Sequence, residues 1–327
     1  MSTYGDINQR TAAWAAAEML SHAAPVEVLA KYGLTKPIPR NKANGASFRR
    51  ANILPPALTP LTEGVQPTPG NITYTDVPVT LDQYGHVVSI TDHVADMAED
   101  PVLKDAAMLC GEQAAETIEI LLWNVLRAGT SVDYANGALR TAVNTPITLG
   151  LQRAATRALK AARAKPITKM LSASPMTATE PVSDAYIGFG HTDLEADIRD
   201  MTGFLPAEKY SVTKPMPYEI GKVEGVRYIL TPVVTKFEDA GGAAGSMVST
   251  SGTSADVYPV VIIGREAYGL TPLRGDQAIK PHVLQPDTPS KSDALGQVGY
   301  VGWKTYFAAA RLNELWMTRL EVACTGL

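Results

Sequence analysis

Residues 100–129 read DPVLKDAAMLCGEQAAETIEILLWNVLRAG, and their spacing predicts one uninterrupted helix. Asp100 is expected to cap the N-terminus, because its carboxylate accepts hydrogen bonds from the free N–H groups of the first turn. Pro101 suits the first helical position, which needs no N–H donor, and Gly129 suits the C-terminal end. One apolar stripe recurs at three- and four-residue steps: Leu103, Ala107, Cys110, Ala114, Ile118, Leu121, Leu122 and Val125. The charged residues, Glu119 among them, fall mainly on other faces. At about 1.5 Å per residue this helix is roughly 42 Å long, so other elements are expected to lie across it.

The composition is that of a folded protein. The chain has 327 residues, of which 45% are hydrophobic and 19% are charged. The first ten residues, MSTYGDINQR, lack the basic start and apolar core of a signal peptide, and no apolar run is long enough to cross a bilayer. We therefore expect a protein that is made and used in the cytoplasm, or leaves without secretion, and that has no membrane partner. Cys110 and Cys324 cannot form a disulfide framework, which leaves either two buried thiols or a single bridge.

The charges are unevenly distributed, although the net charge is only -4. Two long segments, between Glu27 and Glu63 and between Asp133 and Glu180, contain basic residues and no acid. Segregated charge of this kind favours a protein that pairs its basic segments with acidic surfaces of its own copies. Nucleic-acid binding is the rival interpretation, and it is weaker because the whole chain would repel phosphate at long range.

The segments around the helix predict outlying parts. Residues 31–47, which hold prolines, glycines and bases with almost no hydrophobic spacing, read as an arm that is ordered mainly by contact with something else. Residues 48–92 predict a long two-stranded hairpin with its tip at 59–70, where Leu58, Leu61 and Val65 supply apolar side chains. An isolated two-stranded ribbon is barely stable in water, so we expect it to lie on another surface. The rest of the chain alternates between strand-like and helix-like patterns.

No motif in the sequence predicts catalysis. Five histidines are scattered, and the chain contains no nucleophile elbow, CxxC, HExxH or paired-carboxylate pattern. Asp92, His93 and Asp96 could hold a metal ion. We favour instead an acidic helical turn at 91–99, whose carboxylates favour the helix dipole and receive basic arms. We therefore expect no catalytic residue, no cofactor and no metal.

Six stretches carry a resemblance that covers nearly the whole chain from about residue 31. They are KYGLTKPIPRNKANGASFRR, PPALTPLTEGVQP, DQYGHVVSITD, EDPVLKDAAMLCGEQAAETIEILLWNVLRAGT, YPVVIIGREAYG and DALGQVGYVGWKTYFAAARLNELWMTRLEVA. Together they resemble the major capsid proteins of tailed bacteriophages, which have the Hong Kong 97-type fold.

The resemblance implies an α+β fold with four parts. The N-terminal arm would be 1–47, and the extended β-hairpin, or E-loop, would be 48–92. A P-domain with antiparallel strands would take 93–145 and 291–327, with the spine helix at 101–128. A mixed α/β A-domain would take 146–290.

The resemblance also implies a function and partners. The chain would assemble with itself into hexamers and pentamers of an icosahedral shell that encloses double-stranded DNA, contacted non-specifically. A separate scaffold protein is expected, together with a portal and possible cement proteins, and assembly in the bacterial host cytoplasm. An encapsulin-like cellular compartment shares the fold and is the first alternative. An α/β enzyme without a recognisable motif is the second, and a DNA-binding module is the third.

Charge and exposure together nominate a set of residues for contact between subunits. They are Lys36, Arg40, Lys42, Arg49, Arg50, Leu61, Glu63, Val65, Asp92, Asp96 and Glu99.

Overall fold

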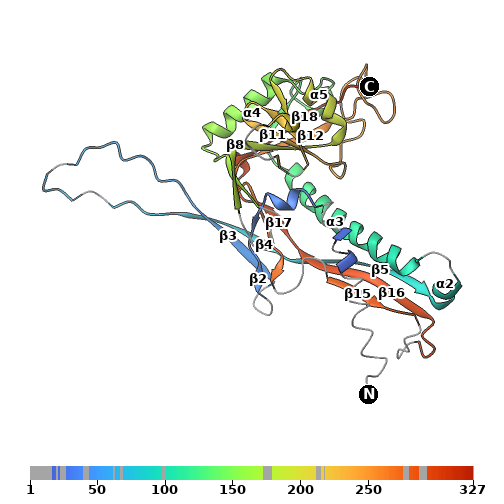
Figure 1. Ribbon diagram of the computed structural model, residues 1–327. Helices are drawn as coiled ribbons and strands as arrows, with labels where there is room; N and C mark the ends of the chain where they lie inside the picture. The colour runs from blue at the N-terminus through green and yellow to red at the C-terminus, as the bar shows by residue number, and fades with distance from the viewer. Residues whose placement is uncertain are drawn as a thin grey trace.

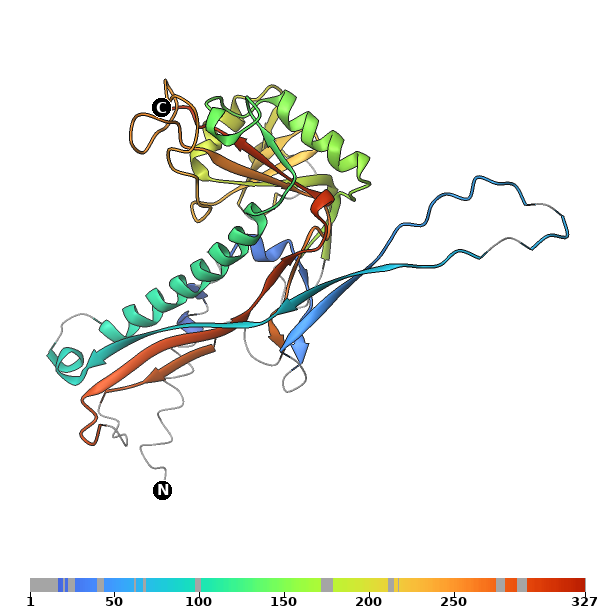
Figure 2. The same ribbon diagram turned by 180° about the vertical axis from the view of Figure 1, so that it is seen from behind.

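The molecule is elongated, with one long helix joining two packed regions (Figures 1 and 2). A thin ribbon, made of strands β3 (Gly45–Ala51) and β4 (Tyr74–Thr80) and the loop 52–73 between them, projects to one side. The computed structural model describes residues 17–19, 21–22, 27–39, 44–61, 63–66, 69–97, 101–171, 179–210, 215–216, 218–274, 280–286 and 293–326. Within them, none of the helices combines the length and the apolar character that crossing a membrane requires.

The described helices and strands have the following bounds. The helices are α2 Asp92–Met97, α3 Val102–Arg127, α4 Leu149–Ala161 and α5 Glu195–Arg199. The strands are β1 Leu34–Thr35, β2 Ile38–Pro39, β3 Gly45–Ala51, β4 Tyr74–Thr80, β5 Asp82–Thr91, β6 Val132–Tyr134, β7 Ile167–Leu171, β8 Thr179–Gly190, β9 Phe204–Pro206, β10 Glu219–Val223, β11 Val226–Leu230, β12 Tyr258–Ile263, β13 Tyr268–Leu270, β14 Leu273–Arg274, β15 Lys280–Leu284, β16 Val298–Phe307, β17 Ala309–Arg311 and β18 Met317–Val322.

The long helix is present as α3, and its 26 residues span about 39 Å. Its start differs from the expectation by one residue. Pro101 occupies the N-cap position, where its carbonyl accepts hydrogen bonds from the N–H groups of Lys104 and Asp105. The proposed cap Asp100 lies outside the described residues. The helix ends at Arg127, and the N–H of Gly129 donates to the carbonyl of Leu126.

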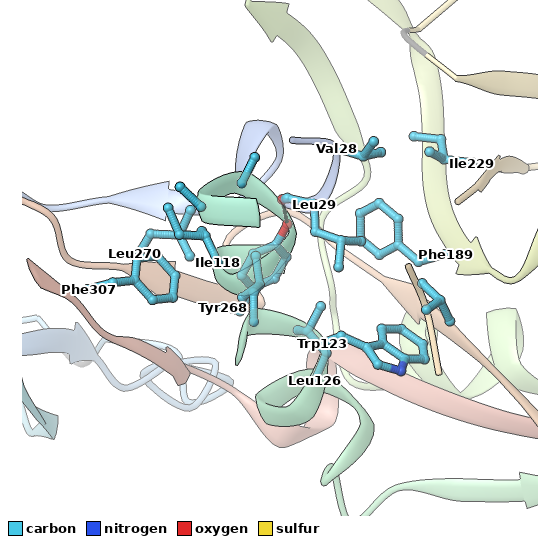
Figure 3. Packing of buried hydrophobic residues seen from close by; sticks show 14 of the residues in the cluster. Val28, Leu29, Ile118, Trp123, Leu126, Phe189, Ile229, Tyr268, Leu270 and Phe307 are labelled. Carbon is cyan, nitrogen blue, oxygen red and sulfur yellow. Dashed lines mark hydrogen bonds between the residues drawn. The ribbon is translucent and has the colours of Figure 1, made fainter. Parts of the chain in front are cut away.

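The buried face of α3 follows the predicted stripe over most of its length. Leu103, Leu121 and Val125 are only half-buried, while Trp123 and Leu126 are fully buried among residues of the sheet and the N-terminal segment (Figure 3). The prediction that Glu119 lies on a face other than the apolar one was wrong. Its side chain is fully buried, because it lies on the same helix face as Ala115 and Leu122 and accepts backbone hydrogen bonds there.

An eight-stranded sheet forms the core of one packed region, in the order β6-β18-β12-β8-β11-β10-β9, with β7 paired to β8. Alternate residues of β12 face opposite sides. Val260 and Ile262 pack with α4 and α5, whereas Val261 and Ile263 pack with residues of α3. Both faces are therefore covered, which explains why β12 is apolar throughout.

The sheet crosses the domain boundaries expected from the sequence. β6 and β18 had been grouped with the long helix, but β18 pairs with β12 along its whole length and β6 pairs with β18. The alternating apolar residues of β18 explain this, because Leu320 and Val322 fill the sheet core with zero exposure.

The ribbon is shorter than the predicted hairpin 48–92. β3 pairs with β4 in continuous antiparallel register from Gly45–Thr80 to Ala51–Tyr74, and the connecting residues 52–73 form no strand among those described. β5 leaves the ribbon and pairs with all ten residues of β16. Glycines explain this close pairing, because a Cβ at Gly302 would lie 2.6 Å from the carbonyl oxygen of His86.

The described part of the N-terminal arm lies on its own chain. β1 pairs with β13 and β2 pairs with β14, both in parallel. Val28 and Leu29 are buried in the main core (Figure 3). Residues 31–39 are thus held by intramolecular contacts, contrary to the expectation that the stretch 31–47 is ordered mainly by contact with something else. Cys110 and Cys324 are both free and buried, which confirms the pair of thiols.

Candidate interaction surface

The nominated residues lie on three separate parts of the molecule. Lys36, Arg49 and Arg50 lie at the base of the ribbon, which consists of β3, β4 and the loop 52–73. Leu61, Glu63 and Val65 lie in that loop, at the far end of the ribbon, and Asp92 and Asp96 lie in α2, beyond one end of α3 (Figure 1). Arg40, Lys42 and Glu99 lie outside the described residues. One subunit does not bring these parts together.

Arg49 is paired within the ribbon. It faces Asp76 across the two strands, with Nε 2.8 Å from Oδ1 and Nη2 2.9 Å from Oδ2. The hydrogen bonds from Arg49 hold the pKa of the Asp76 carboxyl below its ordinary value. Such a two-point fork fixes geometry between neighbouring strands, so Arg49 stabilises the ribbon itself.

Lys36 connects the N-terminal segment to the same strand. Its Nζ donates to the carbonyl oxygen of Ser47 at 2.5 Å and lies 5.7 Å from the centre of the Phe48 ring. Phe48 is buried against Gly269, where a Cβ would approach the ring to 2.7 Å. The base of the ribbon is therefore attached to the N-terminal segment through Lys36 and packed against Gly269 of β13 through Phe48.

Arg50 is placed differently from its neighbour Arg49. Its guanidinium lies 5.8 Å from the Trp316 ring, and its buried Nη1 has no hydrogen-bond partner among the described residues. It borders a pocket of about 240 Å³ between ribbon and body. The lining residues are Leu34, Phe48, Arg49, Arg50, Ala51, Val77, Glu266, Leu312 and Trp316.

The loop of the ribbon exposes apolar side chains to solvent. Leu58 is 85% exposed, Leu61 is 77% exposed and Val65 is 63% exposed. Glu63 is also exposed and begins a turn at Gly64, whose φ of +77° suits glycine. A run of exposed apolar residues on a projecting loop is typical of a surface that another molecule covers.

The acidic turn before the long helix is present as α2. Asp92 is half-buried, and its Oδ1 accepts a hydrogen bond from the N–H of His93 at 2.6 Å. Asp96, Val94 and Met97 are exposed. Within the described residues, no three side chains of the metal-binding types gather as a metal site requires.

A buried carboxylate, Glu119, holds the N-terminal segment, and this contact was not predicted from the sequence. Glu119 accepts three backbone hydrogen bonds, from Val28 at 3.0 Å, Leu29 at 2.9 Å and Ala30 at 3.2 Å. Burial raises the pKa of Glu119 to about 7, although the three N–H donors act in the opposite direction. The hydroxyl of Tyr268 donates to the carbonyl of Leu29 at 2.5 Å, so the segment is held at two points (Figure 3). The sequence contained one signal for this contact, because Glu119 shares a helix face with Ala115 and Leu122, where a buried acid needs hydrogen-bond donors.

A cysteine, a histidine and an aspartate meet near the C-terminus, but their chemistry is structural. The Sγ of Cys324 donates to the carbonyl of Asp193 at 3.3 Å, and the Nδ1 of His191 accepts from the N–H of Asp193 at 3.1 Å. Burial raises the pKa of Cys324 to about 12, whereas a nucleophilic cysteine needs a lowered pKa. The group therefore fixes the chain end.

The comparisons with known proteins point in one direction. A family model described as phage capsid protein matches residues 74–318. No curated protein matches the chain.

Three solved structures are similar over most of their length. The capsid of Ralstonia phage GP4 has 14% identity and a TM-score of 0.64, with 90% of this chain and 87% of that chain covered. The capsid of cyanophage Pam1 has 15% identity and a TM-score of 0.62, with 94% and 93% covered. The head of Helicobacter pylori bacteriophage KHP40 has 12% identity and a TM-score of 0.59, with 92% and 89% covered.

Proposed function

The chain belongs to the phage capsid protein family and is a structural subunit of a virion capsid, and from this premise we propose that it builds the shell by clasping copies of itself. The observation that carries the proposal is the ribbon, whose loop exposes Leu58, Leu61 and Val65 far from the body of its own subunit (Figure 2). Covering this loop with a second copy removes apolar surface from water, at about 25 cal/mol per Å². Many such contacts over a closed lattice would hold a shell that one contact could not.

The finer architecture that we propose is the Hong Kong 97-type fold. The ribbon takes the role of the E-loop, α3 takes the role of the spine helix, and 1–47 is the N-terminal arm. The P-domain comprises 93–145 and 291–327, and the A-domain comprises 146–290, with β6 and β18 lending strands to the A-domain sheet. Hexamers and pentamers would close around the A-domains.

The proposed partners follow from this role. The chain would meet a separate scaffold protein, a portal and possible cement proteins, and it would assemble in the host cytoplasm. The exposed Arg157 and Lys160 on α4 support a non-specific contact with packaged double-stranded DNA, because phosphate contacts need only positive charge. The family match favours the viral shell over an encapsulin-like compartment. We propose a structural role with no enzymatic activity.

Size-exclusion chromatography followed by negative-stain imaging tests the proposal. Purified chain, concentrated stepwise, is expected to elute as capsomers and as much larger particles, and the images are expected to show closed shells of uniform diameter. A chain that stays monomeric at every concentration, with no rings in native mass spectra, would contradict self-assembly.

A further inference from the structure

We propose that the pocket at the base of the ribbon receives the ribbon loop of a second copy of this chain, with Glu63 of the loop paired to Arg50 in the pocket. The proposal rests on the proposed function and names its receiving site. It starts from an unsatisfied hydrogen-bond donor. The Nη1 of Arg50 is buried without a partner among the described residues, although buried donors are nearly always hydrogen-bonded.

The other charges around the pocket are already paired within the subunit. Arg49 is bound to Asp76, and Glu266 lies 3.1 Å from Arg265, measured from Oε1 to Nε. Arg50 is therefore the charge that the pocket presents to an incoming group. A guanidinium matches a carboxylate by two parallel N–H to O bonds, so the expected group is a carboxylate.

The walls of the pocket require apolar neighbours beside that carboxylate. Leu34, Phe48, Leu312 and Trp316 line it together with Arg50. The ribbon loop offers this combination, because Glu63 begins a turn and is flanked by exposed Leu61 and Val65.

A second exposed acid with apolar neighbours occurs in α2, where Val94 and Met97 flank Asp96. The size of the pocket decides against it. A volume of about 240 Å³ corresponds to a few side chains. A helix with its side chains is about 10–12 Å across, so a turn at a loop tip enters where a helix does not.

The pocket is lined by residues at the base of the ribbon, and the loop 52–73 of the same subunit forms the far end of the ribbon (Figures 1 and 2). The occupant is therefore a second copy, and its own pocket remains open to a third. Such a contact joins two different patches of one chain and continues from copy to copy, as a ring or a lattice requires.

A disulfide trap tests the contact directly. Shells of a Leu61→Cys, Leu312→Cys variant, mildly oxidised, are expected to give a ladder of covalent multimers on a non-reducing gel. The matched control is Leu61→Cys with Leu315→Cys, since Leu315 is exposed nearby but does not line the pocket. Normal shells with no ladder, or with equal ladders in the two variants, would overturn the proposal while leaving the capsid role intact. Absence of shells from the unmodified chain would overturn the proposed function instead.

A charge exchange tests the pairing of Glu63 with Arg50. Arg50→Glu and Glu63→Arg are each expected to raise the critical concentration for assembly by about tenfold or more, and the double variant is expected to restore it. Because Glu63 is on an exposed loop, its reversal is expected to leave the melting temperature of the free subunit unchanged. The proposal fails if the double variant assembles no better than the single ones. It also fails if Asp96→Arg, in place of Glu63→Arg, compensates Arg50→Glu.

Discussion

At the scale of single residues, Glu119 shows how one buried acid holds a distant segment. Its two carboxylate oxygens accept the N–H groups of Val28, Leu29 and Ala30, which would otherwise be buried without partners. Burial raises its pKa to about 7, and the nearby carboxyl of Glu27 acts in the same direction. The attachment of the N-terminal segment to α3 is therefore coupled to pH.

The sign of this coupling gives a first prediction. Between about pH 4.5 and pH 7 the folded state binds more protons at Glu119 than the unfolded state. The contribution of Glu119 to the free energy of unfolding therefore falls as the pH rises through this range, and it is constant above about pH 7. Urea unfolding of the free subunit across this range is expected to show the decline relative to Glu119→Gln, which cannot titrate. Titrating groups that do not interact with Glu119 remain in both proteins and cancel in the comparison. Parallel pH profiles for the two proteins would contradict the assignment.

Gly269 gives a second prediction at this scale. A Cβ there would lie 2.7 Å from Cζ of Phe48, so Gly269→Ala is expected to push the ribbon from the body and to cost about 1–3 kcal/mol of unfolding free energy. Chemical denaturation measures the loss. Gly225→Ala is the matched control, because no atom lies within 4 Å of its Cβ position. Adding Phe48→Leu is expected to recover part of the loss, and no recovery would place the strain elsewhere.

At the scale of elements, the loop of the ribbon is expected to be needed for assembly of shells and not for folding of the subunit. β3 and β4 pair fully without help from residues 59–70, and the apolar side chains of that stretch are exposed. Deleting 59–70 is therefore expected to leave the melting temperature of the subunit unchanged and to abolish regular shells in electron micrographs. A Gly/Ser segment of equal length is expected to fail as well, which distinguishes side chains from length. Closed particles of normal size from the deletion variant would show that the loop has another role.

Some of these elements could be predicted from the sequence, whereas the pairing of others could not. The length and stripe of α3 and the acidic turn α2 follow from local spacing and caps, which nearby residues determine. The partner of β5 does not, because β16 lies about two hundred residues away and the local alternation of 82–91 fits either pairing. Glu119 was expected away from the apolar face because it is charged, although its spacing from Ala115 and Leu122 places it on that face. The exposed loop residues were identified, whereas the pocket beside Arg50 needed Leu312 and Trp316 in three dimensions.

At the scale of the whole molecule, the proposed contact predicts that the ribbon loop is uncovered in the free subunit and covered in the shell. Loop 52–73 contains no Lys or Arg but several Leu and Ile residues. Thermolysin is therefore expected to cut the free subunit there, and cleavage is expected to be at least tenfold slower in shells if a neighbour covers the loop. Trypsin serves as the control, since it finds no site in this loop. Mass spectra of the fragments locate the cuts, and equal rates in both states would mean that the loop stays uncovered.

The place of β18 in the large sheet has a consequence for how the chain is made. β18 lies between β6 and β12, yet it follows both of them in the chain. A nascent polypeptide therefore cannot complete this sheet until β18 has left the ribosome. We expect chains truncated before Met317 to be absent from purified virions, so that the order of synthesis itself keeps unfinished products out of the lattice.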